Sequence, residues 1–94
     1  MKEPELLQKA VDYLTKERGM CYVVRRGHDV FTIFDIIYLP NHFGITSFFQ
    51  VTTKEHLWNR RQKIIDFREK HGLPKYSYLM AWDYRIEDFI IEKL

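Results

Sequence analysis

The sequence is poor in residues that reveal a compartment or a cofactor. It has one cysteine, Cys21, so no disulfide can form within the chain, and a reducing, cytoplasmic location is expected. No apolar stretch approaches the ~20 residues needed to cross a membrane, and the acidic start is unlike a signal peptide. The four histidines lack zinc-ligand spacing, and there is no glycine-rich phosphate loop. We therefore expect no membrane partner, and Cys21 should pack as a small apolar residue.

The composition is that of a folded chain. Hydrophobic residues make up 46% and aromatic residues 16% of the 94 positions, so a single domain over residues 1–94 is expected. The net charge of +2 neither supports nor excludes nucleic-acid binding, because only clustered charge matters. Candidate phosphate contacts cluster at Arg25, Arg26, Arg60, Arg61 and Lys63; the alternative is that these are simply solvated side chains.

Apolar spacing predicts seven elements. A helix over residues 4–18 is followed by strands over 20–24, 31–39 and 45–52, a second helix from Thr52 to Gly72, and strands over 76–82 and 85–91. Thr52 and Glu55 fit a capping box at the second helix. The order is α-β-β-β-α-β-β, which predicts an α/β fold with a central mixed sheet flanked by helices.

Asp35 is the most unusual residue, because it interrupts an apolar run. A buried carboxylate is costly unless it is paired, hydrogen-bonded or bound to a metal. Gln50 ends the next predicted strand, so a hairpin between the two strands brings Asp35 and Gln50 together. Their oxygens and nearby backbone carbonyls would suit Mg²⁺ or Mn²⁺. The alternative is an Asp at a strand bend, satisfied by backbone or by an arginine such as Arg61.

The segments 34–38 and 48–53 resemble the signature of the PD-(D/E)xK nuclease superfamily, in particular small proteins related to Holliday-junction resolvases. The matching positions are an aspartate in one strand, Asp35, and a Gln one apolar residue before the expected lysine, Gln50. The first helix, the first strand and a basic helix after the third strand are also similar. The resemblance covers roughly residues 5–82 and implies a restriction-endonuclease-like fold.

The resemblance also implies a set of roles. Asp35 would be the central metal ligand, Gln50 and the carbonyl of Val51 would complete its shell, and Glu5 of the first helix would join them. The family lysine is replaced by Thr52, which carries no charge. Lys54 and Lys63 are the possible substitutes, and loss of activity is the alternative to a moved lysine.

Three functions follow from this sequence. The first is a magnesium-dependent hydrolase, an endonuclease acting on branched or single-stranded DNA. The second is an inactive module that binds DNA or RNA. The third is an interaction protein that forms a homodimer through residues 85–94. The aromatic residues from Tyr76 to Tyr84 could stack on bases, although packing within the sheet is the commoner reason for such a pattern.

Overall fold

The computed structural model describes residues 1–16, 19–24, 33–40 and 45–94. Its elements follow the predicted order α-β-β-β-α-β-β, with a short 3-10 turn, η2, ahead of the second helix. They are α1 (Glu3–Leu14), β1 (Met20–Val23), β2 (Ile36–Leu39), β3 (Ser47–Thr53), η2 (Lys54–His56), α2 (Leu57–His71), β4 (Ser77–Asp83) and β5 (Asp88–Lys93). None of the helices in the described ranges is long and apolar enough to cross a membrane.

The five strands form one mixed sheet in the order β1-β2-β3-β4-β5. The pairs β1–β2, β2–β3 and β4–β5 are antiparallel, whereas β3 and β4 are parallel because α2 carries the chain back between them. The predicted hairpin of the second and third strands is confirmed, with Ile36 opposite Phe49. The predicted α/β class with a mixed central sheet is therefore correct.

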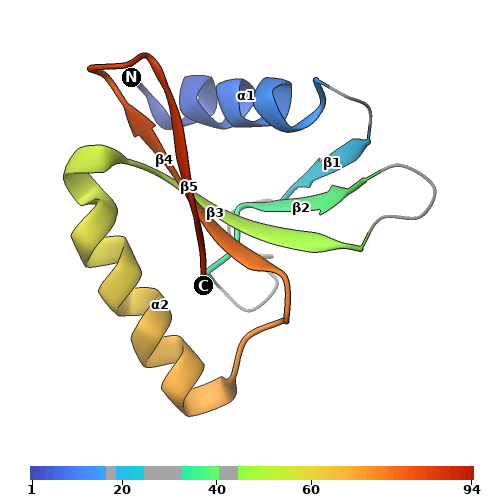
Figure 1. Ribbon diagram of the computed structural model, residues 1–94, viewed down its shortest axis with the longest axis vertical. Helices are drawn as coiled ribbons and strands as arrows, with labels where there is room; N and C mark the ends of the chain where they lie inside the picture. The colour runs from blue at the N-terminus through green and yellow to red at the C-terminus, as the bar shows by residue number, and fades with distance from the viewer. Residues whose placement is uncertain (17–18, 25–32, 41–44) are drawn as a thin grey trace.

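The two helices cover opposite faces of the sheet. Leu6 and Ala10 of α1 share a buried cluster with Met80, whereas Ile64 of α2 shares a different cluster with Leu79. Consecutive residues of a strand point to opposite faces, so the clusters lie on the two sides of β4. Figure 1 shows the same arrangement, with the strands between α1 and α2. Cys21 packs against the α1-side cluster as expected, and burial raises the pKa of its thiol.

Several predicted boundaries were wrong. The strand predicted over residues 31–39 is β2 (Ile36–Leu39), and Asp35 lies at a bend just before it; residues 31 and 32 lie outside the described part of the chain. The capping box is absent, since Thr53 rather than Thr52 precedes the helical turn and no side chain caps it. The final strand begins at Asp88 because the turn before it is longer than predicted.

Gly19 supports the entry into β1 by lying under an aromatic ring. Its φ of +113° is a backbone conformation that residues other than glycine rarely adopt. A Cβ at this position would lie 2.7 Å from Cε2 of Tyr38. The Tyr38 ring packs edge-on against Phe49, with 6.4 Å between ring centroids. Any added methyl group would therefore push this ring away from the core.

Replacing Gly19 by alanine should lower the free energy of unfolding by about 2–4 kcal/mol, combining backbone strain and overpacking. Gly72→Ala is a matched control, because Gly72 also has a positive φ of +75° but open space around its Cα. It should cost about 1–3 kcal/mol, the backbone term alone, because its ψ of 171° lies in a region that is essentially restricted to glycine. Urea denaturation measures both, and equal losses would show that the Tyr38 contact contributes nothing.

Candidate functional site

A cleft of about 860 Å³ lies where the start of α1, the end of β3 and the start of α2 come together. It is at the carboxyl end of the parallel pair β3–β4, where ligands commonly bind in open α/β sheets. Apolar residues from α1 and β1 form one part of its lining. The polar and charged lining residues are Glu3, Gln8, Asp35, Gln50, Thr52, Thr53, Glu55, His56, Arg60, Lys63 and Tyr84.

The backbone of Asp35 fixes its side chain at the cleft. Its N–H donates to the carbonyl of Phe49 at 2.9 Å, and its carbonyl accepts the N–H of Val24 at 2.8 Å. One carboxylate oxygen, Oδ2, accepts two hydrogen bonds of 2.9 Å, one from Nε2 of Gln50 and one from the backbone N–H of Val51. Hydrogen bonds of this kind to a carboxylate offset much of the cost of removing it from water. This arrangement matches the alternative considered from the sequence, an aspartate at a strand bend with hydrogen bonds to the backbone. Here the partners include a backbone N–H and the side-chain amide of Gln50.

Gln50 is buried and its amide nitrogen has two oxygen partners. Besides Asp35 Oδ2, Nε2 donates to the carbonyl of Val51 at 3.3 Å. The predicted proximity of Asp35 and Gln50 is thus confirmed, and the Val51 carbonyl lies at the same point. The amide presents nitrogen rather than oxygen here, so metal ligation by Oε1 requires the amide to rotate about its last side-chain bond.

The chemistry of these donors suits one type of metal site. Mg²⁺ often uses one or two carboxylates and completes its octahedron with waters and substrate phosphate. Asp35, a Gln50 oxygen and the Val51 carbonyl fit that description, since only one of them carries charge. No group of three His, Cys, Asp or Glu residues able to hold a metal occurs within the described ranges. Such a site would take its remaining ligands from waters and, when a substrate is bound, from phosphate oxygens.

The other predicted site residues separate into distinct places. Arg60 and Lys63 line the cleft, as does Glu3, whereas Glu5 is exposed and is not among the lining residues. Arg61 pairs with Glu92 of β5 at 3.0 Å rather than with Asp35. Arg25 and Arg26 lie outside the described residues.

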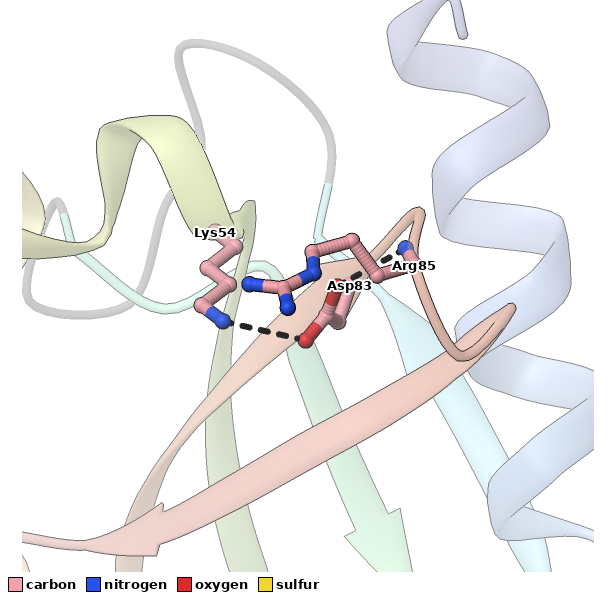
Figure 2. Close-up of polar contacts among 3 residues, drawn as sticks. All are labelled: Lys54, Asp83 and Arg85. Atoms are coloured by element: carbon pink, nitrogen blue, oxygen red, sulfur yellow. Dashed lines mark hydrogen bonds and ion pairs between the residues drawn. The ribbon is translucent and has the colours of Figure 1, made fainter.

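The Lys54 side chain reaches the end of β4. Its Nζ lies 3.2 Å from Oδ2 of Asp83, as Figure 2 shows. The 3-10 turn that follows Thr53 ends the strand, so Lys54 no longer alternates with Thr52 on one face. The described structure therefore brings Lys63, and not Lys54, to the cleft lining.

Asp83 is a buried carboxylate that lies between the two strands predicted over residues 76–82 and 85–91. Its Oδ1 accepts the backbone N–H of Arg85 at 2.9 Å, which closes the turn between β4 and β5. This backbone hydrogen bond is the main cause of a pKa below the usual range; burial opposes it, and the hydrogen bond and charge of Lys54 reinforce it. The ionised form of Asp83 is thus favoured by folding.

Acid should therefore destabilise the protein through Asp83. Because its pKa is lower in the folded chain than the ~3.9 of an unfolded one, its contribution is present above about pH 4 and is lost as pH falls through the folded value. Urea midpoints measured from neutral to acidic pH should fall less steeply in Asp83→Asn. Lys54→Met should keep most of the wild-type slope, since the Arg85 N–H is the larger cause. An Asp83→Asn slope equal to wild type would contradict this.

Comparisons with known proteins returned no match to any family model, curated protein or solved structure. The described part of the chain is a small α/β domain with a five-strand mixed sheet and two α-helices. Within the described residues its most distinctive polar arrangement is the cleft, in which Asp35, Gln50 and the Val51 carbonyl converge.

Proposed function

We propose that this domain is a divalent-metal-dependent nuclease of the PD-(D/E)xK type that hydrolyses phosphodiester bonds of DNA in the cleft. One observation carries the proposal: the Asp35 carboxylate and the Gln50 amide meet at 2.9 Å beside the Val51 carbonyl, on the wall of a cleft. Neither the order of elements nor the charge would suggest this function without that meeting point.

The arrangement of the elements supports the restriction-endonuclease-like reading. The antiparallel hairpin of β2 and β3 is what allows residues fifteen positions apart, Asp35 and Gln50, to touch. The helix after β3 is basic and contributes Arg60 and Lys63 to the cleft. These are the features on which the resemblance in sequence depends, and they occur at one end of the sheet.

Each cleft residue has a physical role in this proposal. Asp35 holds a negative charge in a fixed position, because both its backbone and its Oδ2 are hydrogen-bonded to β3. A bound Mg²⁺ or Mn²⁺ would supply a nucleophilic hydroxide and neutralise charge on the phosphate. Arg60 and Lys63, which also line the cleft, attract the nucleic-acid backbone. Lys63 takes the place of the missing motif lysine, since Lys54 is paired with Asp83.

A second candidate function is binding of DNA or RNA without hydrolysis. The observation that favours it is the pairing of Lys54 with Asp83, together with a buried, neutral Thr52 at the lysine position. No positive charge then follows Gln50 on its own strand. The two functions share the cleft and differ only in turnover.

Metal affinity should respond to charge at position 50. Gln50→Glu places a second carboxylate against Asp35, so Mn²⁺ affinity should rise at least about tenfold, since site affinity follows ligand charge. The same change should lower stability without metal, because two close carboxylates repel. Asp35→Asn should abolish binding, and Asp66→Asn, on the exposed side of α2, should leave it unchanged. Electron paramagnetic resonance of free Mn²⁺ measures the Mn²⁺ affinity of all three variants.

Cleavage assays then separate the two candidate functions. Purified protein with Mn²⁺ is incubated with single-stranded and branched DNA, alone and as Asp35→Asn. Cleavage that disappears in Asp35→Asn supports the nuclease. Binding without cleavage, in a protein that does bind Mn²⁺, supports the second function. Cleavage that survives the substitution would remove Asp35 from the mechanism.

A further inference from the structure

The outer side of β5 presents a row of backbone groups that the sheet does not use. β5 ends the sheet in the described part of the chain and pairs there with β4 alone. Just after β5, the N–H of Leu94 donates inward to the carbonyl of Ser77 on β4. Since the backbone groups of an edge strand point alternately toward and away from its neighbour, those of Phe89, Ile91 and Lys93 point outward. Such an edge can accept another strand.

One of these outward groups already has a partner. The N–H of Phe89 donates to the side chain of Asp88 at 2.8 Å. For the N–H groups of Ile91 and Lys93, the described residues provide no partner on the outer side. The free donors therefore lie in the second half of β5.

Large apolar side chains lie beside this edge on both faces of the sheet. Ile91, 40% exposed, lies opposite a β4 residue of the α1-side cluster, and Ile90, 38% exposed, points to the α2 side. Trp58 of α2 is 65% exposed. It precedes Arg61 by three positions, so both lie on one side of the helix, and Arg61 pairs with Glu92 of β5 at 3.0 Å. Trp58 is therefore on the side of α2 that is turned toward β5.

We propose that β5 is a dimer interface, in which it pairs antiparallel with β5 of a second copy of this chain about a two-fold axis at Ile91. The N–H of Ile91 then donates to the carbonyl of Ile91 in the second copy, and the N–H of Lys93 donates to the carbonyl of Phe89. The symmetry repeats each bond. The hydrogen bond between Asp88 and the Phe89 N–H is kept. The two sheets become one continuous sheet.

The charges on β5 decide where the axis lies. Residues opposite each other in a sheet point to the same face, so the residue at the axis must oppose its own copy. An axis at Ile90 would place Asp88 opposite Glu92 of the second copy. An axis at Glu92 or at Lys93 would place that charge opposite itself. Like charges directly opposite are destabilising, which excludes these three registers.

Hydrogen bonding excludes the register on the other side. An axis at Phe89 would need the N–H that the Asp88 side chain already holds. Of the residues from Phe89 to Lys93, only Ile91 is left, and there an apolar side chain meets its own copy. β5 is thus complementary to itself, which favours a second copy over an unrelated strand as the partner. The pairing requires neither metal nor nucleic acid, so its outcome is independent of the proposed nuclease.

Sedimentation velocity of the intact protein in EDTA measures the dimer directly. Ile91→Asp places two carboxylates at the axis and should raise the dissociation constant at least about a hundredfold. Trp58→Ala should raise it about tenfold or more, since exposed aromatic residues often dominate an interface. Ile86→Asp is the matched control, because Ile86 is 61% exposed in the turn before β5, outside the paired strand, and should leave the constant unchanged.

Two results of this experiment would overturn the interface. The first is a wild-type protein that stays monomeric up to about 1 mM. The second is a dimer whose dissociation constant is unchanged in both Ile91→Asp and Trp58→Ala.

Disulfide trapping tests the register even if Ile91→Asp does not fold. In a Cys21→Ala background, Ile91→Cys should form a covalent dimer on oxidation, because the Cα atoms of a hydrogen-bonded antiparallel pair lie about 5.5 Å apart, within the reach of a disulfide. Ile90→Cys is the control, since Ile90 would oppose Glu92 and lie about 7–8 Å from its own copy, too far to be bridged. A covalent dimer of Ile90→Cys without one of Ile91→Cys would refute the proposed pairing.

Discussion

The structure depends on the way in which Asp35 leads into the start of β2. Its backbone continues the sheet, with an N–H donated to Phe49 and a carbonyl that accepts from Val24. Its side chain then accepts the N–H of Val51, where a continued β2 would have offered a carbonyl. The carboxylate thus replaces one further residue of the strand, and β2 can begin at Ile36 without leaving the Val51 N–H of β3 unpaired. The chain is free to turn away, and the cleft lies beside this point.

This role explains why an acidic residue is tolerated here and also limits what it can bind. Oδ2 holds both Val51 N–H and Gln50 Nε2, so a cation would compete with the amide of Gln50 rather than with the backbone. Turning that amide exchanges a donor for an acceptor at almost no steric cost, because its nitrogen and oxygen are nearly equal in size. In the proposed metal site Gln50 would therefore be the residue that changes orientation, while Asp35 is held by its hydrogen bonds to β3.

The sequence predicted what depends on local pattern and missed what depends on distant contacts. The order of elements and the meeting of Asp35 with Gln50 follow from alternation and a hairpin. Ile33 and Phe34 were assigned to a strand because they are apolar, yet they are buried against α2 outside any strand. Asp83 and Lys54 are 29 residues apart, and Arg61 and Glu92 are 31 apart, so neither pairing had a local signal.

The phase of α2 decides which cations serve the cleft. Ile64 is buried in the core, and Arg61, one turn before it, is held over the sheet by Glu92 of β5. With that face fixed against the sheet, Arg60 and Lys63 are rotated to the neighbouring face, which borders the cleft. The position of positive charge in the cleft is thus set by the packing of Ile64 and not by Thr52 of β3. A neutral Thr52 on β3 therefore does not leave the cleft without a cation, because α2 supplies two.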